Sequence, residues 1–280
     1  MVKLRLIEAG CCCHPEFVTL KGGGWRKATF PAVAAVIEHP TAGTILFDTG
    51  YSPRFFSATR SFPNSLYRWA TPVRVTQAET VNVQMAQFGS GSVDVSSVVL
   101  SHFHADHIGG VSDFPNARII ASDEGWKRVK RLWGLGRVKK GFLPALLPDD
   151  FEERLDPIEQ TFARVALPAS MSPFTKGWDL IGDRSLIAVA LPGHAAGQMG
   201  LYVNATSGPA FLVADACWSS VAFEELRYPS ELSYLVHENR AAYRATLARL
   251  HRLHKSNPEL RIIPAHCSQL KNRFPDLFNA

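Results

Sequence analysis

Short apolar runs recur along the chain, and several of them end at a polar residue that can bind a metal ion. These runs, with the residues that follow them, are 44–47 with Asp48, 98–100 with a histidine cluster, 186–191 with His194 after a Pro-Gly pair, 211–214 with Asp215, and 261–265 with His266. Runs of this kind are typical of strands covered on both faces, and polar residues at their ends lie along one edge of a sheet. The pattern therefore predicts that residues far apart in sequence meet at one sheet edge.

The segments between these runs predict helices at about 79–88, 122–132 and 238–254. The first seven residues alternate charged and apolar side chains, as a first strand does, and lack the continuous apolar stretch of a signal peptide. Strands followed by strands and helices favour two sheets sandwiched between helices. A chain of 280 residues is near the upper limit for one core, so we expect a single domain over 1–280.

The composition is that of an ordinary globular protein, with 46% hydrophobic and 20% charged residues. No apolar run approaches the roughly 18 residues that a membrane span needs, so no membrane span is expected. The five cysteines are an odd number and three of them are consecutive, which suits a reducing compartment better than a disulfide framework. We therefore expect a cytoplasmic protein.

The three consecutive cysteines, Cys11, Cys12 and Cys13, are followed directly by His14. They are either buried thiols near the first strand or, together with His14, an accessory metal or redox site. The net charge of +5 comes largely from basic residues within 127–140 and 240–255. Such runs are usually solvated helix faces, and no nucleic-acid motif accompanies them, so no nucleic-acid partner is expected.

The densest candidate chemistry lies at 101–107, where His102, His104, Asp106 and His107 follow a buried strand and open a helix. His102 and His104 alternate as residues leaving a strand do, whereas Asp106 and His107 point elsewhere. One short loop can therefore serve two metal ions about 3.5 to 4 Å apart. A polar loop whose histidines only form hydrogen bonds is the alternative, and the density of the cluster favours a metal site.

Two further positions support this hypothesis. His194 stands between Gly193 and Gly197, which allow close approach of the backbone and favour a ligand role over a structural one. Asp215 and Cys217 are the only candidates in their loop, and a carboxylate can bridge two cations where a neutral imidazole cannot.

Together these residues resemble the metallo-β-lactamase superfamily of binuclear hydrolases. The resemblance rests on the sequences at 47–50, 102–107 and 192–194 and on Asp215 and His266, in family order. It implies an α/β fold of the αβ/βα four-layer sandwich type. The site residues that it implies are His102, His104 and His194 for one ion, Asp106, His107 and His266 for the other, Asp215 as the bridge between them, and Asp48 as an acid that orients ligands without binding metal.

The resemblance also implies a cofactor and a reaction. Two divalent ions are expected, with zinc best suited to these ligands and iron, manganese or cobalt able to fit similar ones. A hydroxide bridging the ions would open a lactone or ester bond, with Asp106 and Asp215 as the catalytic residues. The expected partner is therefore a small-molecule lactone or ester.

Within the superfamily, the arrangement looks most like the quorum-quenching N-acyl-homoserine lactonases. True β-lactamases with two zinc ions commonly carry a cysteine where Asp215 stands. The lactonases often place a substrate-binding tyrosine three residues after the bridging aspartate, and this chain has Trp218 there. Indole can donate through its N–H but cannot act as a phenol does, so Trp218 and Tyr51 are both candidates for binding substrate.

Other reactions stay open at this point. A thioester hydrolase of the glyoxalase II type, a phosphodiesterase, and a non-hydrolytic metal-binding or redox protein are the alternatives. Two bulky apolar segments are either ordinary core or a wall over the metals suited to an acyl or aromatic group. Their residues are Phe55, Phe56, Phe62, Leu66, Trp69, Leu132, Trp133, Phe142, Leu143, Leu146 and Leu147.

Overall fold

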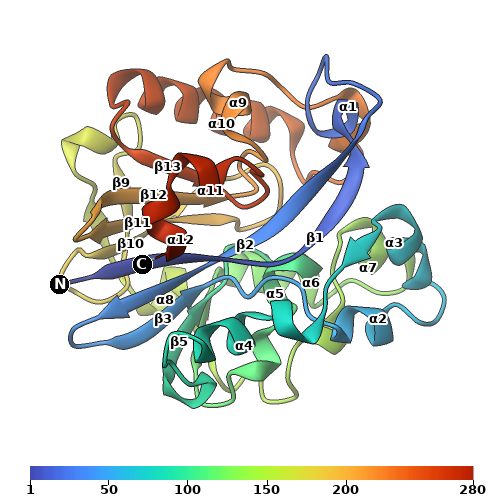
Figure 1. Cartoon of the computed structure of the whole chain (residues 1–280), viewed down its shortest axis with the longest axis horizontal. Helices are drawn as coiled ribbons and strands as arrows, with labels where there is room; N and C mark the ends of the chain where they lie inside the picture. The colour runs from blue at the N-terminus through green and yellow to red at the C-terminus, as the bar shows by residue number, and fades with distance from the viewer. Residues whose placement is uncertain (280) are drawn as a thin grey trace.

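Two β-sheets pack face to face, and helices cover the outer face of each sheet (Figure 1). The computed structural model describes residues 1–279. The strand order is β4-β1-β2-β3-β5-β6-β7 in the first sheet and β13-β12-β11-β10-β9-β8 in the second. This arrangement is the αβ/βα four-layer sandwich predicted from the sequence.

The strands follow one another in two blocks along the chain. In the first sheet they are β1 (Lys3–Pro15), β2 (Lys27–His39), β3 (Gly43–Phe47), β4 (Val73–Arg74), β5 (Val95–Val99), β6 (Arg118–Ala121) and β7 (Leu155–Pro157). In the second sheet they are β8 (Ala163–Ala166), β9 (Lys176–Asp179), β10 (Leu186–Ala190), β11 (Met199–Ala205), β12 (Gly208–Ala214) and β13 (Arg261–Pro264).

Most of the helices are short. The α-helices are α1 (Glu16–Thr19), α2 (Arg54–Ala58), α3 (Ser65–Ala70), α4 (Val81–Ala86), α5 (Ala105–Ile108), α6 (Asp123–Val129), α7 (Leu135–Lys139), α8 (Ile158–Thr161), α9 (Ser220–Glu224), α10 (Arg240–Ser256), α11 (Leu270–Arg273) and α12 (Pro275–Asn279). The 3₁₀ turns are η1 (Gln77–Glu79), η2 (Ser92–Asp94), η3 (Val111–Asp113), η4 (Pro144–Leu146), η5 (Ala169–Met171) and η6 (Glu231–Leu235).

Three apolar clusters hold these layers together. The central cluster contains side chains from both sheets, such as Ile37 of β2 and Leu201 of β11, and it forms the apolar core between the two sheets. A second cluster joins the outer face of the first sheet to α2, α4 and α5, and a third joins the second sheet to α9 and α10. Burial of this apolar surface is the main force that assembles the sandwich.

Strand direction determines where the functional residues meet. β3 runs parallel to β5, and β12 runs parallel to β13. β10 is antiparallel to β11, which is antiparallel to β12, so β10 and β12 point the same way. The loops that follow these strands therefore leave the sandwich at one edge, as the apolar runs predicted.

The three predicted helices exist, but α6 and α4 are shorter than predicted, and α10 has the predicted length with both ends shifted by two residues. α10 is 17 residues long and begins where the Asn239 side chain accepts a hydrogen bond from the Ala242 N–H. α6 begins likewise at a Ser122 cap but ends at Val129. The predicted helix at 79–88 is only α4, because the turn η1 precedes it and extended Thr80 separates the two.

The first strand is longer than predicted and includes all three consecutive cysteines. β1 shifts its register against β2 between Glu8 and Cys11, where Gly10 has a φ of 75°. Cys12 and Cys13 are buried, and Cys11 is half-buried. The prediction of buried thiols near the first strand is therefore confirmed for Cys12 and Cys13 but not for Cys11.

No helix among residues 1–279 combines the length and the apolar character that crossing a bilayer requires.

Candidate metal centre

The structure brings together all seven residues that the sequence predicted as metal ligands. They form two groups of close donor atoms, His102, His104, His194 and Asp215 in one and Asp106, His107 and His266 in the other, and within each group the donor atoms lie within 4.8 Å of one another. The loop after β5 and helix α5 supply the first four along the chain, and the loops after β10, β12 and β13 supply the others. All but the half-buried His104 are buried.

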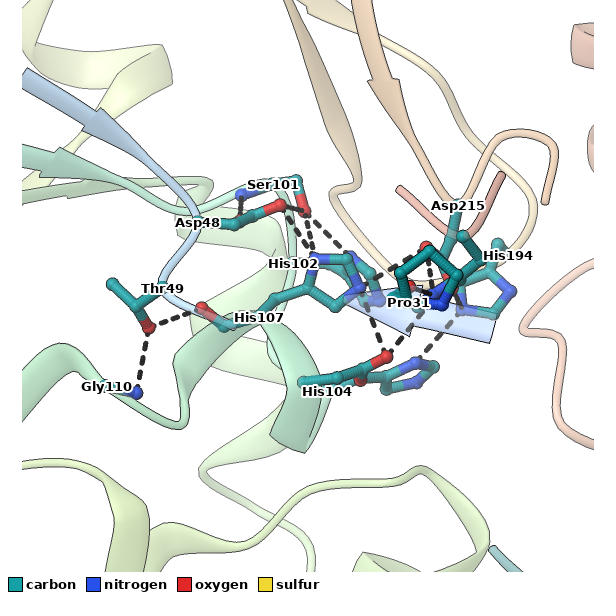
Figure 2. Close-up of polar contacts among 12 residues, drawn as sticks. Pro31, Asp48, Thr49, Ser101, His102, His104, His107, Gly110, His194 and Asp215 are labelled. Carbon is teal, nitrogen blue, oxygen red and sulfur yellow. Dashed lines mark hydrogen bonds and ion pairs between the residues drawn. The ribbon is translucent and has the colours of Figure 1, made fainter. Parts of the chain in front are cut away.

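Asp215 lies between the two groups, and its two carboxylate oxygens face different histidines (Figure 2). Oδ2 lies 3.2 Å from Nε2 of His194. Oδ1 lies 3.1 Å from Nε2 of His266 and 3.3 Å from Nε2 of His107. Each oxygen is therefore directed at a different set of donors, which is the geometry of a carboxylate that can be shared by two cations.

Asp48 fixes the orientation of the His107 imidazole through a hydrogen bond. Nδ1 of His107 donates a 2.7 Å hydrogen bond to Oδ2 of Asp48, and the Ser101 N–H and hydroxyl donate to the two Asp48 oxygens at 2.8 Å each (Figure 2). A carboxylate only accepts hydrogen bonds, so the proton of a neutral His107 is on Nδ1 and its Nε2 has a free lone pair. Asp48 itself has a φ of 60°, a backbone conformation that the loop after β3 imposes.

The same logic orients His102 and His266. The Ser101 hydroxyl already donates to Asp48, so it accepts from Nδ1 of His102 at 3.0 Å. Nδ1 of His266 donates to the carbonyl of Pro31 at 2.7 Å. In both histidines Nε2 is left to face the centre, and a fixed tautomer of this kind is typical of metal-binding histidines.

Hydrogen bonds of the Thr49 hydroxyl fix the position of helix α5. Its hydroxyl donates to the carbonyl of His107 at 2.8 Å and accepts from the N–H of Gly110 at 3.0 Å (Figure 2). The next residue, Gly50, has a φ of 65°, and a Cβ there would lie 2.2 Å from Cβ of Ala9. The sequence after β3 therefore ties the first strands to the helix that carries two candidate ligands.

Gly193 lets the loop that carries His194 pack closely against α10. Its φ is 135°, and a Cβ at this position would lie 2.1 Å from the backbone nitrogen of Tyr243 in α10. The loop can therefore approach α10 closely and direct His194 inward, as the sequence suggested. Nε2 of His194 then lies 3.0 Å from Nδ1 of His104, so both nitrogens can serve the same ion.

The donor set fits a pair of metal ions. Four buried atoms of these residues form no hydrogen bond within the described part of the chain, namely Nε2 of His102, Nε2 of His107, Nδ1 of His194 and Oδ1 of Asp215, although the His107 and Asp215 atoms lie within ion-pair distance of each other. Buried polar atoms are rarely left unpaired, because the loss of hydration is costly. Nε2 of His107 and Oδ1 of Asp215 face other donor atoms of the two groups, where a cation would satisfy them.

Burial keeps three of the imidazoles neutral. It lowers the pKa of His104 to about 4 and lowers the pKa values of His102 and His194 well below the ordinary value of histidine. A neutral imidazole keeps the lone pair that a metal ion needs. These three histidines are therefore prepared for metal binding at neutral pH.

The other group behaves differently. Burial alone would lower the pKa values of His107 and His266, but the surrounding carboxylates, led by Asp48 for His107 and by Asp215 for His266, raise both well above the ordinary value. Burial alone would raise the pKa of Asp215, but His266, His194 and His107 lower it well below its usual range. Metal ions must therefore displace protons from this group, which makes their affinity dependent on pH.

The centre lies at the bottom of a cavity of about 660 Å³, a size that accommodates a small organic molecule. His104, Asp106, His194, Asp215 and His266 are exposed to it. Its walls are largely apolar and come from separate parts of the chain, including Val18, Phe30, Tyr67, Leu232 and Leu235. A substrate can thus reach both donor groups while an apolar part of it contacts the walls.

Of the two interpretations of the bulky apolar segments, the wall over the metals named the wrong residues. None of the eleven bulky residues proposed for it lines this cavity. Phe55, Phe142, Leu143 and Leu146 are part of the core, whereas Phe62, Trp69 and Trp133 face solvent. The segments were right, since their neighbours Tyr67, Ala70, Thr71, Val138 and Gly141 line the cavity, but periodicity in such short helices does not tell which face turns inward.

Both predicted substrate-binding residues border the cavity, but one of them has its donor occupied. Nε1 of Trp218 donates a 2.9 Å hydrogen bond to Oδ2 of Asp215. Indole has no second donor, so Trp218 supports the carboxylate instead of offering an N–H to a substrate. Tyr51 is almost fully buried at the cavity wall, and burial raises the pKa of its hydroxyl well above the ordinary value, which keeps it a hydrogen-bond donor.

Sequence reasoning assigned no role to several residues of the centre. Ser101 links Asp48 to His102, and its position directly before the first histidine was the available signal. The ring centroid of His237 lies 4.9 Å from that of His194, but no sequence motif around His237 indicated this position. Cys12 and His14 border the cavity, but neither donor group among residues 1–279 contains a cysteine.

Comparison with known proteins identifies the family. The sequence profile of the metallo-beta-lactamase superfamily matches residues 29–256. The chain therefore belongs to the metallo-beta-lactamase superfamily, in agreement with the resemblance in its motifs and with the four-layer fold.

Several similar proteins are named as lactonases. The N-acyl homoserine lactonase AiiB of Agrobacterium fabrum is 26% identical over 201 residues, which are 68% of this chain and 65% of that protein, so the chain matches slightly less than two thirds of that relative. The N-acyl homoserine lactonase AttM of Azorhizobium caulinodans is 27% identical over 240 residues, 84% of each chain.

A solved structure shows the same fold. An N-acyl homoserine lactone hydrolase, crystallised with the product N-hexanoyl-L-homoserine at its catalytic metal center, superposes with a TM-score of 0.74 over 98% of this chain and 96% of that one. The two sequences are 17% identical, so the likeness concerns the architecture.

Proposed function

We propose that this protein is a binuclear metal-dependent hydrolase that opens the ring of a lactone, and that N-acyl homoserine lactones are the substrate class to test first. The observation that carries the proposal is the position of Asp215, whose Oδ2 faces His194 while its Oδ1 faces His107 and His266. The names of the similar lactonases support the choice of substrate.

Two ions would be held by the residues already described. His102, His104 and His194 would hold one ion, Asp106, His107 and His266 the other, and Asp215 would hold both. Bound divalent ions supply Lewis acidity, which polarises a carbonyl and brings the pKa of water toward neutrality. Zinc suits this set of imidazoles and carboxylates best.

Asp106 is placed to move protons during the reaction. Its carboxylate borders the cavity, and its Oδ2 lies 3.2 Å from Nε2 of His266. When a water oxygen attacks the lactone carbonyl, Asp106 would take the proton that the water loses. When the ring carbon–oxygen bond breaks, the same carboxylate would return the proton to the leaving alkoxide, which gives a hydroxy acid.

The remaining residues hold the reacting groups in place. Asp48 and Ser101 keep His107 and His102 oriented through their Nδ1 atoms. Tyr51 would donate a hydrogen bond to the substrate from the cavity wall, because the N–H of Trp218 is occupied by Asp215. The apolar walls would contact the acyl group.

The proposal is tested by measuring the metal content of the purified protein together with its activity on lactones, aryl esters, thioesters and phosphodiesters. About two ions per chain with lactones as the best substrates is the expected result. Two ions with turnover of only thioesters or phosphodiesters would replace the lactone proposal with another hydrolysis. A protein that binds no metal would overturn the mechanism itself.

A further inference from the structure

Most of the large exposed hydrophobic side chains belong to segments that line the cavity. Twelve are exposed in the described chain, and nine of them lie on four segments that contribute residues to the cavity wall: Trp25, Phe62, Leu66, Trp69, Trp133, Leu135, Leu232, Leu235 and Val236. We call these nine residues the apolar rim. Figure 1 shows α1, α3 and α7, which belong to three of these segments, at the same end of the molecule.

Three tryptophans are the most exposed members of this rim. Trp25, Trp69 and Trp133 are 85%, 84% and 82% exposed, although indole is one of the largest apolar side chains. They stand on separate segments, before β2, on α3 and before α7. Scattered apolar residues on a surface need no explanation, but their concentration on the segments that line one cavity marks an interaction site.

The charge around the rim is entirely of one sign along three of the segments. Residues 17–27, 50–78 and 125–148 contain 14 of the 30 lysines and arginines and none of the 25 aspartates and glutamates. The rest of the chain has 16 basic and 25 acidic residues, so the net positive charge of the protein originates here. Nine of the 14 form no ion pair with any described residue: Lys21, Arg26, Lys27, Arg60, Arg68, Arg74, Arg131, Arg137 and Lys139.

Tryptophans combined with unpaired cations are suited to the surface of a lipid bilayer. Indole favours the headgroup region, where its ring is in apolar surroundings and its N–H meets polar groups, and lysine and arginine are attracted to anionic headgroups. We propose that the apolar rim and its basic segments dock the protein on an anionic membrane surface, with the cavity opening toward the lipid. A substrate with an apolar tail would then reach the centre directly from the bilayer.

Two other occupants are less compatible with these observations. A symmetric dimer through this face would place the basic segments of two copies against each other, and like charges repel. Nucleic acid would explain the charge, but the aliphatic members Leu66, Leu135, Leu232 and Leu235 offer no stacking surface to a base. The lipid surface accounts for both the charge and the apolar side chains, and the proposal does not depend on which bond the centre hydrolyses.

The test is flotation with vesicles of phosphatidylcholine alone and of phosphatidylcholine mixed with phosphatidylglycerol. We expect binding to the mixed vesicles that weakens as salt is raised. The variant Trp25→Ala, Trp69→Ala, Trp133→Ala should bind at least tenfold more weakly. Phe88→Ala is the matched control, since Phe88 is an exposed aromatic residue outside the rim.

Charge-reversal variants show whether binding to vesicles depends on the basic segments or on the net charge of the whole protein. A triple variant with charge reversals in the basic segments should bind anionic vesicles on the order of 100-fold more weakly, because each lost cation costs roughly fivefold or more. Its substitutions are Arg26→Glu, Lys27→Glu and Arg131→Glu. Lys176→Glu, Arg252→Glu and Lys255→Glu alter the net charge equally at exposed positions outside the rim and should bind nearly as the original protein does. The midpoint of thermal unfolding should be unchanged in both variants, which shows that they are folded.

Three outcomes would overturn the proposal. These are no preference for anionic vesicles, equal loss of binding in the two charge variants, or a stable dimer in solution that the tryptophan variant converts to a monomer. Preferential binding of RNA over vesicles at equal salt would assign the basic segments to nucleic acid instead. None of these results would affect the hydrolase proposal, which is read from metal content and turnover.

Discussion

The indole N–H of Trp218 donates a 2.9 Å hydrogen bond to Oδ2 of Asp215, the carboxylate that lies between the two groups of metal-binding atoms. Trp218 therefore helps to hold the carboxylate whose two oxygens face histidines of both groups. A hydrogen bond to a charged group is worth about 1.5 to 3 kcal/mol, so this contact is strong enough to affect metal binding and catalysis.

Trp218→Phe should lower kcat/KM for the best substrate by roughly 10- to 100-fold, because phenylalanine keeps the aromatic ring but has no donor for Asp215. Steady-state kinetics with saturating metal measures the effect. Trp178→Phe, on β9, is the matched control and should have little effect. Unchanged kinetics in Trp218→Phe would mean that the hydrogen bond contributes nothing to the reaction.

Asp215→Asn should reduce the bound metal below two ions per chain and lower turnover by about 100-fold or more, since the amide keeps the size but not the charge of a shared ligand. Elemental analysis and kinetics measure the two effects. Asp183→Asn changes a carboxylate that pairs with His39 outside the centre, so it controls for the loss of one negative charge. Full activity with two ions still bound in Asp215→Asn would contradict the bridging role.

Asp48→Asn should cost roughly 10- to 100-fold in metal affinity or activity, because an amide accepts the Nδ1 proton of His107 less well and can donate to it instead. Ser101→Ala removes the hydroxyl that donates to Asp48 and accepts from Nδ1 of His102, but it leaves the contact between Asp48 and His107, so its effect should be smaller. Metal titration compares the variants. If Ser101→Ala were the more damaging change, the serine and not the aspartate would be the main support of the histidines.

Removal of metal with a chelator should lower the thermal unfolding midpoint by several degrees. A ligand present at 100 times its Kd stabilises the folded state by about 2.7 kcal/mol, and each kcal/mol shifts the midpoint of a protein of this size by about 2 to 4 °C. Scanning calorimetry before chelation, after it, and after zinc is restored measures the shift. A midpoint that does not respond to chelation or to zinc would show that the donor groups bind no ion in the folded protein.

Gly193→Ala should destabilise the fold by several kcal/mol and disturb His194, since the new Cβ would lie 2.1 Å from the backbone nitrogen of Tyr243. Gly89→Ala is the control, because Gly89 also has a positive φ, 78°, but a Cβ there meets nothing within 4 Å. It should cost only the backbone strain, on the order of 1 kcal/mol. Chemical denaturation compares the two, and equal losses would show that strain and not close packing makes Gly193 necessary.

Much of the architecture was predictable because apolar runs and capping residues are local signals. The strands before Asp48, His102, His194, Asp215 and His266 all exist and end at one edge of the sandwich. Helix α10 begins within two residues of the predicted position, since its Asn239 cap is visible in the sequence. The short helix α4 was less predictable, because the capped turn η1 before it is as favourable locally as another turn of α-helix.

The candidate residues of the centre can be identified from the amino-acid sequence alone, because metal-binding side chains at strand ends and glycines such as Gly193 are recognisable without a fold. The tertiary structure was needed to establish which oxygen of Asp215 faces which histidine, that Trp218 donates to Asp215, and that the segments carrying the exposed tryptophans line the cavity. These features depend on side-chain orientations and on packing between segments far apart in the chain. Local periodicity carries no information about either, so they are determined only when the two sheets and their helices close on one another.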